Sequence, residues 1–259
     1  MIVFDPSQHS PERAQSMLSQ VVAPRPIAMI STAGADGLVN VAPFSYFMAV
    51  TGRPLLVAVS MGLRASDARD KDTYLNAMRT GDFVINVTVD AMRGDIELAA
   101  MEFPPHASEL TAVEWTSISS QRVSSPSLAE SPAHLECRVH RVVELGEPGI
   151  LCSEVHLVIG EVVCVVLDES VCTDDFQVDQ RKLAPVGRMG FPWFTRSTPE
   201  SMFQQTRVSY EEFAATGLRP RSVESALRGL DSEALRGIAP ADAVQWIAAG
   251  AAGRDDRPD

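Results

Sequence analysis

Apolar positions along the chain change period several times, and these changes outline the elements that we expect. Runs of strand length rich in apolar or β-branched residues cover residues 28–32, 39–43, 55–60, 83–87 and 155–167. Leu135, Cys137 and Val139 alternate with polar neighbours, which predicts a further, half-buried strand. The first two runs flank a tight turn at residues 33–37 and are predicted to form a hairpin.

Helical signals are weaker and cover shorter segments. Ser10 is a typical N-cap, and the proline and glutamate after it suit the first turn of a helix. Gly81 is suited to ending another helix. The predicted helices cover residues 10–18, 72–79 and 90–101, and residues 124–127 are predicted to be loop.

The order of these elements predicts the fold class. Many strands with a few inserted helices, and no regular alternation of strand and helix, argue against a doubly wound parallel sheet. They favour a mainly β fold, an antiparallel barrel with added helices. We therefore expect a barrel domain over residues 1–207 and a helical C-terminal extension over residues 208–259. Within the extension, amphipathic patterns predict short helices at residues 210–213, 223–230 and 241–248.

Composition and charge narrow the function classes. The chain has 259 residues, of which 45% are apolar, and a formal net charge of -12. That charge repels phosphates, so neither nucleic acid nor a membrane surface is expected as a partner. No apolar run approaches the roughly 18 residues that span a bilayer, and residues 1–13 lack a signal-peptide pattern. The four cysteines have no metal-binding spacing, so we expect no metal and a reducing, cytoplasmic setting.

Several common catalytic motifs are missing from the sequence. There is no GxGxxG after a strand, which would mark a Rossmann nucleotide site, and no GxxxxGK[ST] loop. GxSxG and HExxH are missing as well. The sequence therefore gives no support to a kinase, a serine hydrolase or a metallohydrolase.

A first candidate site is a phosphate site at the start of the helix predicted over residues 72–79. Lys71 supplies a positive charge there and Thr73 a hydroxyl donor. The first backbone N–H groups of a helix lack partners within the helix, and the helix dipole favours an anion beside them. The alternative is that residues 69–72 are only a solvated run of charges and that Thr73 only caps the helix.

A second candidate site is the run from Asn40 to Phe47, NVAPFSYF. The run breaks strand alternation, which predicts a kinked strand end. Its backbone amides, serine hydroxyl and aromatic faces suit the flat isoalloxazine ring of a flavin. The alternative is a buried strand end with its aromatic rings in the core. Ser60, at the end of another predicted strand, either reaches the same pocket or caps a turn.

Together with flanking segments, the two candidate sites carry a family resemblance. The flanking segments are Arg25-Pro26-Ile27-Ala28, Ile159-Gly160-Glu161-Val162 and Pro185-Val186-Gly187-Arg188-Met189-Gly190. Their order and spacing resemble the flavin reductase family of FMN-binding split-barrel proteins, over about residues 5–207. The resemblance implies FMN as the cofactor and a homodimer with the flavin near the subunit interface. It implies contacts to the ring and ribityl chain from Asn40, Ala42, Pro43, Ser45, Tyr46 and Phe47, and to the phosphate side from Ser60, Lys71 and Thr73.

The same resemblance singles out residues near the end of the domain. Many family members carry a histidine just before the late Gly-Glu-Val strand, near where nicotinamide stacks. His156 is the candidate catalytic residue here, although it is displaced by one position, and an ordinary strand histidine is the alternative. Arg188 matches a frequent Gly-Arg and is expected to bind a phosphate or to form a structural salt bridge. Trp193 and Phe194 either cover the flavin or form core or dimer contacts.

The function that the resemblance implies is NAD(P)H-dependent flavin reduction. A hydride would pass from NADH or NADPH, stacked on the flavin, to FMN, and the reduced flavin would supply a partner monooxygenase. One alternative is an enzyme that keeps FMN tightly bound and acts on its own small organic substrate. Another is a flavin-binding module without catalysis. No side chain needs to act as an acid or base in flavin reduction, so no catalytic residue is expected beyond His156.

Overall fold

A computed structural model describes residues 1–217, apart from positions 105, 176, 204, 206 and 207. The chain divides into two compact units, Met1–Ser197 and Thr198–Asp259. The division expected between residues 207 and 208 stays a prediction. In the second unit, the helix expected at residues 210–213 is confirmed as α6 (Tyr210–Thr216), after the short η4 (Pro199–Ser201). The helices expected at residues 223–230 and 241–248 lie outside the described residues.

The first unit consists mainly of strands, with short helices inserted between them. Its strands are β1 (Arg25–Pro26), β2 (Ala28–Ala33), β3 (Val39–Phe44), β4 (Phe47–Gly52), β5 (Leu55–Gly62), β6 (Asp82–Val87), β7 (Ser117–Ile118), β8 (Ser127–Leu128), β9 (Ala133–Leu145), β10 (Val155–Leu167), β11 (Val186–Arg188) and β12 (Phe194–Arg196). Its helices are η1 (Pro6–Gln8), α1 (Pro11–Val21), α2 (Asp72–Thr80), η2 (Asp90–Met92), α3 (Ile96–Ala99), α4 (Leu110–Val113), η3 (Glu169–Val171) and α5 (Gln180–Leu183).

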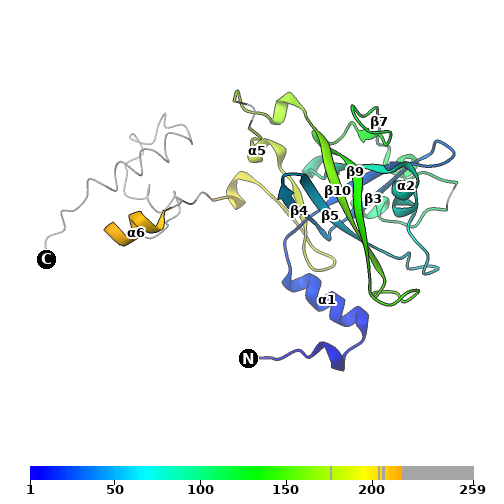
Figure 1. Ribbon diagram of the computed structural model, residues 1–259, viewed down its shortest axis with the longest axis horizontal. Coiled ribbons are helices and arrows are strands. Elements are labelled where there is room, and N and C mark those ends of the chain that lie inside the picture. The colour runs from blue at the N-terminus through cyan, green and yellow to red at the C-terminus, as the bar shows by residue number, and fades with distance from the viewer. Residues whose placement is uncertain (105, 176, 204, 206–207, 218–259) are drawn as a thin grey trace. The chain divides into compact units, whose positions relative to one another are not determined.

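The largest sheet has seven strands in the order β3-β2-β6-β9-β10-β5-β4 (Figure 1). Every neighbouring pair in it is antiparallel, which confirms the mainly β, antiparallel class expected from the sequence. Smaller sheets join β1, β11 and β12, and β7 and β8.

The two outer strands of the large sheet follow each other directly in the chain. Only Ser45 and Tyr46 separate the end of β3 from the start of β4. A bridge of that length spans about 10 Å at most. The edges of a flat seven-stranded sheet would lie about 29 Å apart, because neighbouring strands are about 4.8 Å apart. The sheet therefore has to curl into a barrel, and the two-residue bridge crosses its seam.

Local chemistry explains why the expected helices and hairpin form. Ser10 caps α1, its hydroxyl accepting a hydrogen bond from the backbone N–H of Arg13 at 3.4 Å. Gly81 ends α2 in the left-handed conformation, with φ of 76°, which costs glycine little. The hairpin of β2 and β3 turns through Gly37, which also has a positive φ of 82°. These predictions from local signals are confirmed.

The structure corrects three expectations for the middle of the chain. The helix predicted over residues 90–101 is wrong: two short pieces, η2 and α3, stand in its place. Ser127, expected to be loop, begins β8. In β9, Glu136 was expected on the polar face of a half-buried strand, but its side chain is fully buried. The reason is that residues 121–131 cover that part of the sheet.

Two buried carboxylates hold this covering segment. Glu136 accepts hydrogen bonds from the backbone N–H groups of Gln121 at 2.7 Å and Arg122 at 2.6 Å. Asp82 accepts from the backbone N–H and hydroxyl of Ser124, at 2.9 and 2.8 Å, and from the N–H of Ser125 at 3.0 Å. The loop is thereby fixed to the sheet, and the N–H of the buried Ser125 has a partner.

The core has two layers because strands such as β2 are buried on both faces. Ala28 and Ile30 point into one apolar cluster with Phe83 and Met61, inside the barrel. Met29 points the other way, into a cluster with Trp115 and other residues of the inserted segments. The inserted helices and loops therefore form a second layer of core outside the barrel, beside which the candidate site is placed.

Gly160 in β10 is expected to tolerate no larger residue. A Cβ there would lie 2.6 Å from Cζ of Phe83 and 3.2 Å from Cβ of Cys137, both of which are fully buried. We expect Gly160→Ala to lower the free energy of unfolding by about 1–3 kcal/mol through overpacking, measured by urea denaturation. Gly52→Ala, on the outer strand β4 with nothing within 4 Å of its Cβ position, is the matched control. Equal stability of the two variants would contradict the prediction.

Candidate functional site

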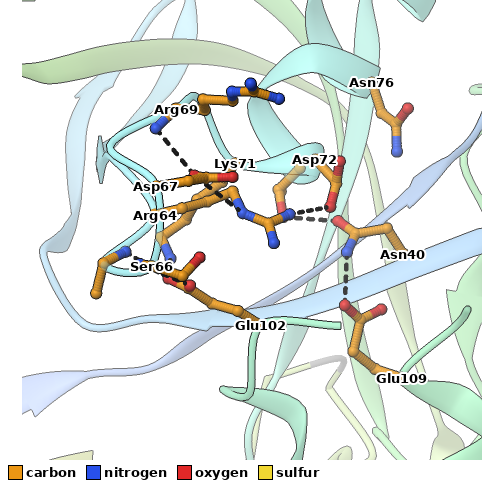
Figure 2. A network of polar contacts seen from close by, with 12 residues as sticks. Asn40, Arg64, Ser66, Asp67, Arg69, Lys71, Asp72, Asn76, Glu102 and Glu109 are labelled. Carbon is orange, nitrogen blue, oxygen red and sulfur yellow. Dashed lines mark hydrogen bonds and ion pairs between the residues drawn. The ribbon is translucent and has the colours of Figure 1, made fainter. Parts of the chain in front are cut away.

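A hollow lies between β3, the start of α2 and the segment that follows α3 (Figure 2). Most of its lining side chains are polar or charged. It is lined by Asn40, Ala42, Arg64, Lys71, Asp72, Thr73, Ala99, Ala100, Met101, Glu102, Phe103 and Glu109. The hollow thus brings together four of the residues singled out from the sequence: Asn40, Ala42, Lys71 and Thr73.

The start of α2 forms one wall of the hollow. Lys71 is the N-cap residue of this helix, and its side chain makes no capping hydrogen bond. Thr73 is 1% exposed, and its hydroxyl donates to Oδ1 of Asn40 at 2.7 Å. Because that proton is committed, the Thr73 hydroxyl is left with acceptor capacity, while the Lys71 ammonium and the helix amides remain the donors toward an anion.

Asn40 is held between α2 and a buried carboxylate. Its Nδ2 donates to Oε1 of Glu109 at 3.0 Å (Figure 2). The N–H of Val41 donates to Oε2 of Glu109 at 2.9 Å. Glu109 is 5% exposed. Burial raises the pKa of Glu109 above its ordinary value, although the hydrogen bonds from Val41 and Asn40 oppose the rise. The amide of Asn40 therefore has a fixed orientation, set by both of its neighbours.

An arginine and a second carboxylate also line the hollow, and both contact the start of α2. Nη1 of Arg64 lies 3.2 Å from Oδ2 of Asp72, and its Nε lies 3.5 Å from Oδ1 of Asp67. Glu102 accepts hydrogen bonds from the N–H groups of Ala65 at 2.6 Å and Ser66 at 3.0 Å (Figure 2).

The charge state of Glu102 follows from these contacts. Its Oε1 also lies 3.8 Å from Nζ of Lys71. Burial alone would raise the pKa of Glu102, but the hydrogen bonds from Ser66 and Ala65 and the charge of Lys71 hold it below its ordinary value. Glu102 is therefore an anion at neutral pH, seated among donors.

Sequence reasoning missed Arg64, Glu102 and Glu109. Each stands outside a motif and in or beside a segment with little periodicity, so no local pattern marked it. Arg64 follows β5, and the two glutamates lie between α3 and α4, just beyond the helix expected over residues 90–101, where the sequence predicted no element. The signal that does exist is a charged residue beside an apolar strand or helix end, and it is too common to be specific.

The remaining residues of the run from Asn40 to Phe47 lie along the barrel seam. Ser45 Oγ accepts from Nε of Arg25 at 3.5 Å, and the Arg25 guanidinium lies 5.4 Å from the centre of the Tyr46 ring. Phe47 packs partly against the core inside the barrel. Pro43 pairs with Met29 across β2. The kinked strand end expected from the sequence is confirmed by the bend at Ser45 and Tyr46.

Ser60 lies beside this bend rather than in the hollow. Its backbone N–H donates to the carbonyl oxygen of Tyr46 at 2.9 Å, and it pairs with Leu157 across β10. It was expected on the phosphate side of the cofactor. The structure puts it next to the run at the seam, and its contact to the phosphate side stays a prediction.

His156 and Arg188 do not line the hollow. His156, 5% exposed, stacks on Tyr74 with ring centres 4.0 Å apart, and its Nε2 lies 2.7 Å from Oδ1 of Asp70. Arg188 forms an ion pair with Glu97 and lies over the Phe194 ring, 4.2 Å from its centre. The salt bridge left open for Arg188 is thus present. A catalytic role for His156 and a cofactor contact for Arg188 stay predictions.

The donors around the hollow suit a phosphate group. A lysine, consecutive loop amides and a helix start are the groups that bind phosphate in proteins. No group of three or more metal-ligating side chains stands together in the part of the chain that the structure describes. No helix among the described residues is long and apolar enough to cross a membrane.

A curled antiparallel sheet with an aromatic run at its seam and a polar hollow beside it defines the class, a β-barrel protein. Comparisons identify the family. The Flavin reductase like domain model matches residues 21–183. The uncharacterized protein YwrF of Bacillus subtilis is 37% identical over 172 residues, which are 66% of this chain and 82% of the relative.

Solved structures agree with the sequence match. Nitrilotriacetate monooxygenase component B from Bacillus cereus has a TM-score of 0.70 and 27% identity, covering 76% of this chain and 95% of that chain. The 2-nitrobenzoate 2-nitroreductase NbaA from Pseudomonas fluorescens has a TM-score of 0.69 and 23% identity. The match covers 81% of this chain and 97% of that chain. The chain belongs to the flavin reductase like domain family, and the split-barrel fold class is confirmed. A flavin is the cofactor class that this family implies.

Proposed function

We propose that this protein is an FMN-binding oxidoreductase that reduces FMN with NADH or NADPH. The observation that carries the proposal is the placement of Lys71 at a helix start, beside two loop amides and adjacent to the run from Asn40 to Phe47. A phosphate in the hollow and a ring along the seam need sites next to each other, and the fold brings these two together.

The residues present fit an FMN phosphate. Lys71 supplies a point charge, and Ala65 and Ser66 present consecutive N–H groups that already hold a carboxylate, Glu102. A carboxylate on paired amides is a chemical stand-in for phosphate oxygens. Nε of Arg64 is buried and makes no hydrogen bond, although it lies 3.5 Å from Oδ1 of Asp67 in an ion pair.

The roles of this chain's residues are binding, orientation and exclusion of water. Lys71 and the amides of Ala65 and Ser66 would hold the phosphate, while Asn40, fixed by Glu109, would orient the ribityl chain. The aromatic residues Tyr46 and Phe47 would give the ring an apolar wall. A bound flavin accepts a hydride from a nicotinamide without help from a protein acid or base.

The partners follow from the same proposal. Component B of a monooxygenase is among the similar structures, at 27% identity, which favours a separate oxygenase component as the user of reduced flavin. We also propose a homodimer, because β4 exposes Met48 and the turn before β12 exposes Phe191 and Trp193. Four free cysteines, of which Cys137 is buried with a raised thiol pKa, support a reducing cytoplasmic setting.

The test is an absorption titration of the purified protein with FMN, followed by anaerobic NADH and then NADPH. We expect FMN to bind and its band near roughly 450 nm to bleach with one of the two nucleotides. FMN that binds and is bleached by neither contradicts the reductase proposal. FMN that cannot be removed by gel filtration contradicts supply to a partner and favours an enzyme with its own substrate. Light scattering on the same sample should give twice 28.0 kDa; a single-chain mass contradicts the homodimer.

A further inference from the structure

The loop after β5 forms an anion cradle that Glu102 occupies. Two consecutive backbone N–H groups, of Ala65 and Ser66, donate to the two different oxygens of its carboxylate, at 2.6 and 3.0 Å (Figure 2). Nζ of Lys71 lies 3.8 Å from one of these oxygens. The arrangement matches how proteins bind a free phosphate or carboxylate, except that the anion belongs to the same chain.

Glu102 reaches the cradle from a distant segment. It stands 36 residues beyond Ser66, just after α3, whose Ile96 and Ala99 are buried in the outer core. Its neighbour Met101 is 56% exposed. The carboxylate thus sits at the end of a short tether whose base is fixed by apolar packing and whose tip lies against solvent. Such a tip can leave the cradle without disrupting the core.

The positive charges around the cradle are too few to neutralise a second anion. Asp67 and Asp72 already neutralise Arg64, at 3.5 and 3.2 Å. Lys71 has Glu102 as its counter-charge. A phosphate that entered while Glu102 stayed would put a dianion beside a carboxylate on the same two amides, which like-charge repulsion disfavours.

We propose that Glu102 is a built-in competitor for the phosphate of the ligand, so that FMN binds only as the Glu102 carboxylate leaves the cradle. This inference rests on the proposed function and adds the control of affinity to it. A site that is filled by its own chain for most of the time binds ligand with an apparent affinity equal to the intrinsic affinity multiplied by the small fraction of molecules in which the site is empty. Return of Glu102 to the cradle also assists release, which suits a protein that passes reduced flavin on.

The test compares the Kd of FMN and of riboflavin, by flavin fluorescence, in the wild type and in Glu102→Ala. Removing the competitor is expected to tighten FMN binding about tenfold or more. Riboflavin lacks the phosphate, so its Kd should stay the same. Glu102→Gln, which keeps the size but offers a neutral, weaker acceptor, should lie between wild type and Glu102→Ala, and it serves if the alanine variant folds poorly.

The matched control is Glu130→Ala. Glu130 also accepts a hydrogen bond from a loop N–H, that of Thr116 at 2.9 Å, but it lies outside the hollow. It should leave both dissociation constants unchanged. FMN affinity that is unchanged or weaker in both Glu102 variants overturns the inference and leaves FMN binding itself standing.

The proposed function fails separately if the wild type binds neither flavin. In that case inorganic phosphate, titrated by calorimetry, decides the inference on its own. Tighter phosphate binding by Glu102→Ala than by the wild type supports a competing carboxylate, whatever the natural ligand is. Equal phosphate binding by both proteins overturns it.

Discussion

Replacing Lys71 with methionine is expected to weaken FMN binding about tenfold to a hundredfold. Hydrogen bonds to charged groups contribute about 1.5–3 kcal/mol, and each 1.4 kcal/mol corresponds to about tenfold in Kd. Methionine keeps the length and the apolar stem of the side chain and removes the ammonium group. Part of the loss is offset, because Glu102 also loses its counter-charge. The phosphate dianion loses more electrostatic attraction than the single Glu102 carboxylate does, so the net change still weakens FMN binding.

The ligand and the chain both offer controls for this prediction. Fluorescence titration with riboflavin should give the same Kd for the wild type and Lys71→Met, because riboflavin has no phosphate. The sequence contains only one other lysine, Lys182, which lies exposed in α5. Lys182→Met makes the same change in net charge and should not affect either ligand. Equal losses for FMN and riboflavin in Lys71→Met would show that Lys71 does not bind the phosphate.

The second large effect is expected on stability, from Asp82→Ala. Asp82 accepts three hydrogen bonds from Ser124 and Ser125, and both Asp82 and Ser125 are buried. Removing the carboxylate leaves the buried N–H of Ser125 without its partner and also removes the two hydrogen bonds from the exposed Ser124. Because an unsatisfied buried group costs about 1–3 kcal/mol and the lost hydrogen bonds of Ser124 add to that cost, we expect a loss of about 2–4 kcal/mol in the free energy of unfolding at neutral pH. Urea denaturation measures the loss.

The loss should depend on pH in a defined direction. Burial alone would raise the pKa of Asp82, but the hydrogen bonds from Ser125 and Ser124 outweigh it and lower the pKa below the ordinary 3.8. Between the folded and unfolded pKa values the unfolded chain binds more protons, so the stabilisation is complete above about pH 4 and is lost as the pH falls further. The difference between wild type and variant should shrink below that pH. A difference that grows in acid would contradict this assignment.

An exposed carboxylate provides the control for Asp82. Asp168 also accepts a hydrogen bond from a backbone N–H, that of Ser170 at 2.8 Å, at the start of η3. Since water can replace this bond, Asp168→Ala should cost about 1 kcal/mol, the usual effect of losing a cap. Similar losses in the two variants would mean that burial of the Asp82 cluster contributes little.

The strands could be predicted from periodicity because the residues that each strand buries in the barrel form a pattern within that strand's own sequence. The runs at residues 28–32 and 155–167 became β2 and β10 with little change in their bounds. Periodicity failed at Glu136, because a loop distant in sequence covers its strand and turns a polar position into a buried one. It failed over residues 90–101 as well, where two short pieces, η2 and α3, each place residues in the outer core.

The candidate site divides in the same way. Lys71 and Asn40 lie in segments whose composition signals a helix start and a strand end, so each was found from its own neighbourhood. Glu102 and Glu109 act through partners far away in the chain, at Ser66 and Asn40. Nothing local to a glutamate indicates which distant amide it will meet, so these contacts could only come from the structure.

The seam of the barrel, which the two-residue bridge at Ser45 and Tyr46 crosses, can form only late in folding. The strand β4 joins the sheet through β5, and β5 is joined to the rest through β10, far later in the sequence. Contacts of such long separation form slowly, because a large loop has to be closed first. During synthesis, a chain that has not yet reached β10 already contains every residue from Asn40 to Phe47 but has no barrel seam to hold them. The site that we propose for the flavin therefore forms late, near the completion of the domain.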